Sequence, residues 1–185
     1  DSYGSRGLGD VYKRQVRDSA LFSGELLDLK IGGPSVYPYQ PNGLWADVSH
    51  YGYPSGFTSQ KYLPGSGKAN HRRSMYTVWK RTSPPPSMTI FDAPNRETCV
   101  VRRLQTNTPM QALVLQNDPQ FLEAATSLGN IMSLKSSIAE GITIGFIKTL
   151  GRKPQEMELN ILSKSFHKYL KNFEDVSSFS SKKIP

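Results

Sequence analysis

Helix start signals in the C-terminal half constrain the fold of this 185-residue chain more than any other feature. Thr108 and Gln111 make a capping box, and Pro109 takes the first helical position, where the N–H that proline lacks is not needed. A second start follows closely, since Asp118 is an N-cap residue and Pro119 comes directly after it. Two such starts in close succession predict consecutive helices with a short connection.

Two further helices are expected after these. Ser137 with Glu140 forms another capping box, and the helix that it opens should stop at Gly151. The last helix should open after Pro154, with Glu156 in the first turn, where the helix dipole is positive. Four helices with short connections predict a C-terminal helical bundle within a mainly α fold. The apolar stripes of the last three are Phe121, Leu122, Ala125, Leu128, Ile131 and Met132; Ile138, Ile142, Phe146 and Ile147; and Leu159, Leu162, Phe166, Tyr169, Leu170 and Phe173.

The N-terminal half is expected to hold one helix and a long ordered loop. Apolar residues at helical spacing begin at Val16, and the Gly32-Gly33 pair should end the helix. Residues 31–52 are rich in proline and glycine, which predicts a loop rather than a regular element. Its aromatic side chains are either anchors on the protein's own core, which we favour, or a platform for stacking sugars. These side chains are Tyr37, Tyr39 and Trp45.

The segment between this loop and the capped helices gives mixed signals. Residues 51–70 show little apolar periodicity and are expected to be irregular. Residues 72–81 fit a helical face slightly better than strand alternation, so a helix is predicted there. The triplet at 84–86 predicts a short polyproline-like spacer. Residues 87–94 are expected to be extended and residues 97–103 are rich in β-formers, which together allow at most a small two-stranded β element.

Basic side chains crowd this central segment and provide the first candidate binding site. The chain has 23 Lys and Arg against 15 Asp and Glu, a formal net charge of +8. Guanidinium groups bind sulfate, carboxylate or phosphate through paired hydrogen bonds, and a helix start also favours anions. The competing interpretation is that Asp92, Glu97 and helix C-termini pair with these cations structurally. The anion-binding candidates are Arg72, Arg73, Lys80, Arg81, Arg96, Arg102, Arg103 and Asn107.

The sequence offers two routes to catalysis, neither of them a complete constellation. Asp92 and Glu97 would supply the carboxylate pair that glycoside hydrolysis needs, although Asp92 also has the properties of a turn former. Cys99 would be a nucleophile if neighbouring arginines stabilised its thiolate, or else a small buried residue in its β-rich run. We favour the structural interpretation of each.

Several functional classes lack their sequence signals. A single cysteine rules out an intramolecular disulfide and a multi-thiolate metal site, and His50, His71 and His167 are isolated, with no HExxH motif. There is no phosphate-binding GxxxxGKT motif and no window of roughly 18 apolar residues, so no membrane span is expected. The arginines alternate with apolar residues instead of forming a basic arm, which argues against nucleic-acid binding.

Four long motifs carry a family resemblance. In chain order they are IGGPSVYPYQPNGLW, RRSMYTVWKRTSPPPSMTIFDAPNRETCVVRR, TNTPMQALVLQNDPQFLEAA and GRKPQEMEL. They closely resemble the C-terminal domain of unknown function of large planctomycete and verrucomicrobial proteins, where it typically lies downstream of a planctomycete-type cytochrome c domain. The resemblance covers about residues 16–173.

This resemblance implies an exported, extracytoplasmic protein of the cell envelope, in a family often considered alongside polysaccharide degradation. Its implied partners are the other domains of the parent protein or an anionic glycan. The chain has no CxxCH motif, so no cofactor is expected in this fragment and any haem c would lie in an upstream domain. We therefore expect a non-catalytic accessory or interaction module, with an enzyme or binding module acting on acidic or sulfated polysaccharide as the alternative.

The domain boundaries follow from the ends of the resemblance. Residues 1–15 resemble translated adaptor sequence from metagenomic assemblies, particularly at DVYKRQ, and are expected not to be native. Residues 16–176 are expected to form a single domain, the C-terminal fragment of a larger protein. Residues 177–185 should be a frayed tail.

Overall fold

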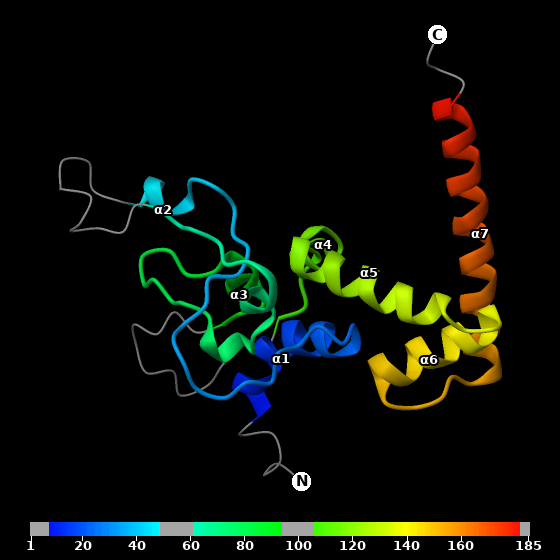
Figure 1. The fold of residues 1–185 in the computed structure, drawn as a ribbon, viewed down its shortest axis with the longest axis horizontal. Coiled ribbons are helices and arrows are strands. Elements are labelled where there is room, and N and C mark those ends of the chain that lie inside the picture. The colour runs from blue at the N-terminus through cyan, green and yellow to red at the C-terminus, as the bar shows by residue number, and fades with distance from the viewer. Residues whose placement is uncertain (1–7, 49–60, 94–105, 182–185) are drawn as a thin grey trace. The chain divides into compact units, whose positions relative to one another are not determined.

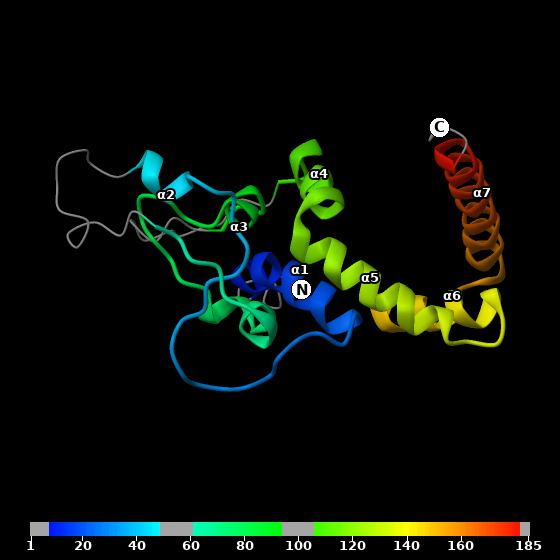
Figure 2. The same ribbon diagram turned by 45° about the horizontal axis from the view of Figure 1, so that its top comes forward.

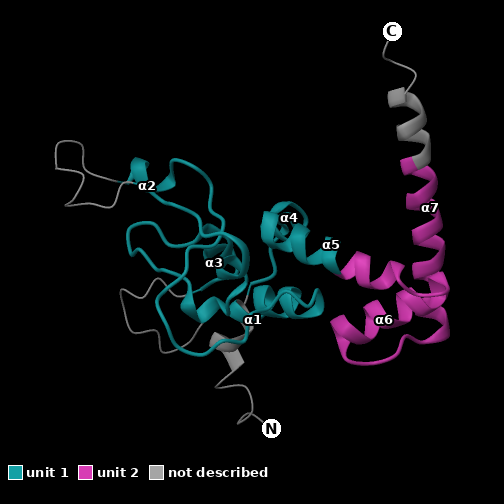
Figure 3. Ribbon diagram, in the orientation of Figure 1, with its two compact units in different colours: residues 1–127 teal, residues 128–185 magenta. Residues whose placement is uncertain are grey.

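The computed structural model describes residues 8–48, 61–93 and 106–181 of the chain (Figure 1). It divides into two compact units, residues 1–127 and 128–185 (Figure 3). Regular structure in the described ranges is helical, which confirms the predicted mainly α fold. The elements are α1 (Leu8–Ser23), α2 (Leu44–Asp47), the 3-10 helices η1 (Gly67–His71) and η2 (Ser74–Tyr76), α3 (Pro86–Ile90), α4 (Pro109–Asn117), α5 (Pro119–Ser133), α6 (Ile138–Leu150) and α7 (Glu156–Ser181).

The N-terminal helix ends earlier than the sequence predicts. α1 stops at Ser23 and not near the Gly32-Gly33 pair, because Glu25 adopts a left-handed φ of 57°. The backbone then turns back on the helix, and the Leu26 N–H donates to the Leu21 oxygen at 2.9 Å. The leucines after residue 25 therefore belong to the following loop instead of the helix.

Close packing between α1 and α5 forms the centre of unit 1. A Cβ on Gly24 would lie 2.7 Å from the Ala124 oxygen, so glycine permits the backbones to approach this closely. The Ser127 hydroxyl donates to the Gly24 oxygen at 2.7 Å across the same contact. The buried apolar side chains of unit 1 are Leu21, Val36, Trp45, Met88, Phe121 and Ala124.

Residues 72–81 do not form the predicted helix. The structure has only η2 there, followed by extended backbone at Thr77. The Val36 N–H donates to the Tyr76 oxygen at 2.8 Å, and the Val78 N–H donates to the Val36 oxygen at 2.9 Å. Because these backbone groups bond to a neighbouring segment, they cannot also make the bonds of an α-helix. Among the described residues, β-structure is limited to isolated bridges such as this one.

The prediction that residues 87–94 are extended is also wrong, because α3 occupies their first half. The Thr89 N–H donates to the Pro85 oxygen at 3.1 Å, and proline is favoured in a first helical turn, so the proline triplet starts a helix. Asp92 ends it with a left-handed φ of 56°. Residues 97–103, the other half of the expected β element, lie outside the described residues.

The helix starts predicted in the C-terminal half are confirmed. The Thr108 N–H donates to Gln111 Oε1 at 3.3 Å in the capping box that opens α4. The Asp118 carboxylate accepts a backbone N–H of the first turn of α5 at 2.9 Å, and the Ser137 hydroxyl accepts one from α6 at 3.2 Å. Gly151 ends α6 with a left-handed φ of 72°.

The helices predicted for the bundle are divided between the two units. α4 belongs to unit 1, where it contacts α3, whereas α6 pairs with α7 in unit 2. α6 also approaches the end of α5 closely, since a Cβ on Gly141 would lie 2.8 Å from the Met132 oxygen. α7 projects away from α6 in both ribbon views (Figures 1 and 2) and continues past Ser177 to Ser181.

Candidate functional site

Arg72, the first of the candidate anion-binding residues, is held by the protein's own backbone. Its side chain is 6% exposed. Nη1 donates to the Pro34 oxygen at 3.0 Å and Nη2 donates to the Lys30 oxygen at 3.2 Å, while the guanidinium carbon lies 3.9 Å from the ring centroid of Tyr76. Arg72 therefore fixes the turn at residues 30–34, and carbonyl oxygens accept from both terminal nitrogens of its guanidinium group.

The other described candidates differ from Arg72 in exposure and contacts. Lys80 lies with its Nζ 4.6 Å from the ring centroid of Trp45. Arg73, Arg81 and Asn107 are exposed. Anion binding by these exposed side chains stays a prediction. Arg96, Arg102 and Arg103 lie outside the described residues.

Arg17 of α1 is the central polar contact of unit 1, and sequence analysis did not single it out. The side chain is buried, and its Nη1 donates to the Arg72 oxygen at 2.9 Å and to Ser74 Oγ at 3.1 Å. Its Nε donates to Gln120 Oε1 on α5. Asp18 Oδ1 lies 3.5 Å from Nη1 and accepts the Ser74 N–H at 2.8 Å. Burial lowers the pKa of Arg17, and the Asp18 charge opposes this shift.

Asp92 forms a local polar link that holds two chain segments together. Its carboxylate accepts the Thr106 N–H at 3.0 Å and the Thr106 hydroxyl at 2.8 Å. Gln111 of α4 extends this link, since its Nε2 donates to Thr106 Oγ1 at 3.2 Å. Both carboxylate oxygens accept bonds from Thr106, which is the geometry expected of a turn-forming Asp92. Glu97, its candidate catalytic partner, lies outside the described residues.

The aromatic residues of the long loop form a compact cluster. The ring centroid of Trp45 lies 6.4 Å from that of Tyr37 and 5.1 Å from that of Tyr62. The Tyr62 hydroxyl donates to the Pro38 oxygen, and burial raises the pKa of Tyr62. Trp45 is only 6% exposed, so its ring anchors the loop and has no open face for a sugar. Tyr37 and Tyr39 remain partly exposed.

Histidine and cysteine provide no described metal site. His71 Nε2 lies 3.1 Å from Glu123 Oε1, and His167 hydrogen-bonds within α7. His50 and Cys99 lie outside the described residues. Across the described ranges, no group of three or more His, Cys, Asp and Glu side chains is arranged to hold a metal ion.

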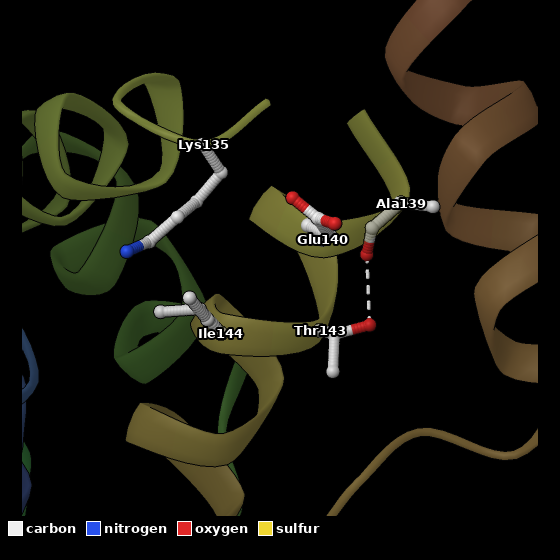
Figure 4. A pocket seen from close by; sticks show the side chains of 5 residues that line it. All are labelled: Lys135, Ala139, Glu140, Thr143 and Ile144. Carbon is white, nitrogen blue, oxygen red and sulfur yellow. Dashed lines mark hydrogen bonds between the residues drawn. The ribbon is translucent and has the colours of Figure 1, made fainter. Parts of the chain in front are cut away.

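A pocket of about 280 Å³ opens on unit 2 at the start of α6 (Figure 4). Its polar side chains are one cation, one carboxylate and one hydroxyl. The hydroxyl belongs to Thr143 and donates to the Ala139 oxygen at 2.7 Å, within the helix. A lone lysine and a lone glutamate, both exposed, do not make a catalytic constellation. The lining residues are Lys135, Ala139, Glu140, Thr143 and Ile144.

α7 carries an exposed apolar surface, which we name the α7 stripe. Its side chains repeat at helical spacing on one face, and Phe166 and Phe173 are 44% and 74% exposed. α7 projects away from α6, so no other described helix of unit 2 runs along its C-terminal half (Figures 1 and 2). No helix in the described ranges is both long and apolar enough to cross a membrane. The stripe consists of Leu159, Leu162, Phe166, Tyr169, Leu170 and Phe173.

Comparison with protein families identifies the chain. The model of the PSD1 family, described as protein of unknown function (DUF1553), matches residues 11–166. The chain belongs to the PSD1 family. Searches of curated proteins and of solved structures return no match.

The PSD1 match includes the contacts described for unit 1 and for the α6 pocket. It takes in Arg17, the Asp92 link and the α6 pocket, and it ends at Phe166 within α7. The PSD1 description names no activity, so a function for this chain has to be argued from its own surfaces.

Proposed function

We propose that this PSD1 chain is a non-catalytic interaction module and that the α7 stripe is its docking surface. The exposed stripe is the observation that supports this most directly. Contiguous apolar surface rimmed by polar residues is typical of protein interaction sites, whereas single exposed apolar residues need no explanation. The stripe runs along one helix face from Leu159 to Phe173, and five of its six side chains are exposed.

The free energy available from the stripe is comparable with the cost of association. Burying a large apolar side chain completely contributes about 1.5–3 kcal/mol. From the exposed fractions of its five exposed side chains, 39–74%, covering the stripe would contribute on the order of 4–8 kcal/mol. Association costs about 4–15 kcal/mol, so the stripe supports docking best where the partner adds apolar surface of its own or is held close.

The sequence resemblance supports the setting of this module. It favours a large exported bacterial protein, in which other domains would be the docking partners and an upstream domain would carry haem c. In that setting this chain positions its neighbours and binds no cofactor of its own.

An action on acidic or sulfated polysaccharide is the second candidate. It is supported by the net charge of +8 together with the exposed side chains of Arg73 and Arg81. Binding is favoured over hydrolysis here, because the Asp92 carboxylate is engaged with Thr106. Release of reducing ends from a sulfated or uronic-acid glycan would contradict the non-catalytic proposal.

Hydrogen exchange tests the docking proposal. We expect α7 amides to exchange quickly in the dilute 185-residue chain, since most side chains of the stripe are exposed, and slowly in a longer gene product that contains the neighbouring domains. Phe166→Glu should restore fast exchange in the longer protein, because it places a charge in the covered surface. Equal exchange of α7 in the two proteins would contradict the proposal.

A further inference from the structure

The α7 stripe follows the spacing of a two-helix interface. Leu159, Leu162, Phe166, Tyr169 and Phe173 are separated by three, four, three and four residues. This alternation defines the a and d positions of a heptad, at which the side chains of one helix insert between those of another. The pattern therefore favours a helix as the partner of α7.

The positions that flank the stripe carry almost no charge. In the same heptad, Ser163 and Leu170 occupy e positions, and Glu158, Ser165 and Asn172 occupy g positions. Glu158 is already engaged, since its Oε2 accepts from Arg152 Nη1 at 2.9 Å. Charged e and g residues normally select an oppositely charged partner. A neutral rim lacks this selection and is compatible with an identical helix, which presents the same neutral rim.

The lysines of α7 argue against a lipid surface as the cover. Lys164, Lys168 and Lys171 occupy c and f positions, on the side of the helix opposite the stripe. A helix that lies in a membrane interface places lysines beside its apolar face, where they reach the lipid headgroups. On α7 they would instead point into water, as the outer residues of a paired helix do.

We infer that a second copy of this chain covers the α7 stripe, with the two α7 helices antiparallel. In this register Leu162 faces Phe173 of the second copy, and Phe166 faces Tyr169 of the second copy. The two-fold axis repeats both layers, as an isologous dimer requires. Antiparallel pairing also aligns opposite helix dipoles and keeps the two α6 helices, each at the base of its own α7, at opposite ends of the interface (Figures 1 and 2).

This inference rests on the proposed docking role of α7, and it names a second copy of the chain, in place of another domain of the parent protein, as the partner of the stripe. The contact is short, since the twelve residues of helix from Leu162 to Phe173 span about 17 Å. Short interfaces of this kind are at the weak end of specific association. The dimer should therefore dissociate on dilution in the micromolar range.

Sedimentation velocity of the full chain over a range of concentrations tests the inference. We expect a reversible monomer–dimer equilibrium for the unchanged chain and an increase in Kd of at least about tenfold for Phe166→Glu. Ile161→Glu is the matched control, since Ile161 is 57% exposed on α7 but lies outside the stripe. It should change Kd by no more than about twofold. Circular dichroism should show unchanged helix content in both variants, because both side chains are exposed.

Disulfide trapping tests the orientation. Chains with Ser165→Cys mixed with chains with Asn172→Cys should form a crosslinked pair, because g positions face each other in an antiparallel interface, and the unchanged chain provides the control for Cys99. Crosslinking by Phe166→Cys alone, without the mixed pair, would indicate parallel helices and overturn the arrangement.

A chain that stays monomeric at every concentration, or equal effects of the two glutamate variants, would overturn the second-copy inference. Binding of the monomer to anionic phospholipid vesicles, abolished by Phe166→Glu, would replace it with a membrane surface. Slow α7 exchange in the longer gene product combined with a monomeric isolated chain would leave the proposed docking function intact and refute only this partner.

Discussion

Replacing Gly141 with alanine should destabilise unit 2, although alanine is the better helix former. Alanine in a helix interior is favoured over glycine by about 1 kcal/mol. Against this gain, the new Cβ would lie 2.8 Å from the Met132 oxygen. That oxygen is a backbone atom, so the clash is relieved only if α5 and α6 move apart. Overpacking of this kind costs about 1–3 kcal/mol, and the free energy of unfolding should fall by about 1 kcal/mol in sum.

Gly129→Ala is the matched control for this change. Gly129 lies inside α5, and a Cβ there would meet no atom within 4 Å. The same gain in helix propensity is therefore unopposed, and the variant should be stabilised by about 1 kcal/mol. The difference between the Gly129 and Gly141 variants isolates the cost of separating the helices.

Urea unfolding followed by far-ultraviolet circular dichroism measures both variants. Trp45 and Trp79 both lie in unit 1, so tryptophan fluorescence followed in parallel reports on the other unit. A Gly141→Ala chain as stable as Gly129→Ala would refute the reasoning.

Gly145→Ala extends the test to a glycine whose nearest neighbour is a movable side chain instead of a backbone atom. Its Cβ would lie 2.7 Å from Met132 Sδ, the end of a flexible side chain. Adding Met132→Ala should remove the clash in a Gly145→Ala background but not in a Gly141→Ala background, where the backbone oxygen remains. Relief of both variants by Met132→Ala would contradict the distinction.

Three further changes have defined outcomes. Arg17→Ala should lower the free energy of unfolding by about 3–5 kcal/mol in urea titrations, because its buried partners lose their hydrogen-bond donor. Arg73→Ala, at an exposed position, should change the free energy of unfolding by less than about 0.5 kcal/mol. Equal effects of the two variants would contradict the structural role of Arg17. Hydrogen bonding to Arg152 lowers the pKa of Glu158 to about 2. The stability that this pair provides should therefore be complete above pH 4.5 and lost as the pH falls towards 2. Carbon-detected NMR titration of Glu158 should find the low pKa, and a value near 4.5 would contradict the prediction. Asp92→Asn should leave thermal stability nearly unchanged, because asparagine tolerates a left-handed φ. Asp92→Ala should lower the free energy of unfolding by about 1–3 kcal/mol. Equal stability of the two variants in calorimetry would refute the turn-forming role.

Sequence predicted the parts of this fold that depend on near neighbours. The cap at Thr108 and the stop at Gly151 are bonds within a few residues, so local chemistry decides them. Residues 72–81 were predicted wrongly because their backbone partners lie around residue 36, and no local pattern reveals such a pairing. The extended structure predicted for residues 87–94 is wrong for a different reason. The proline triplet predicts a spacer, but proline is also favoured at a helix start.

The candidate site was harder to predict than the helices. Arg72 is predicted as an anion-binding candidate or a structural ion pair, whereas its observed partners are carbonyl oxygens of the 30–34 turn, which carry no sequence signature. Arg17 was missed, yet it lies four residues before the fully buried Leu21 and therefore on the buried face of α1. A charged residue at core spacing was the signal available. The α7 stripe, in contrast, was visible in full, and only its exposure required a structure.

The contacts of Arg17 also influence how the chain is made. Its guanidinium bonds to groups 55, 57 and 103 residues further along the chain. At a synthesis rate of about 5–20 residues per second, roughly 5–20 s pass between the synthesis of Arg17 and that of Gln120. The guanidinium group of an arginine is well solvated during this interval, whereas a leucine in its place would expose apolar surface to other chains. Joining distant segments through a cation thus leaves less apolar surface on the growing polypeptide than an apolar contact at the same place would.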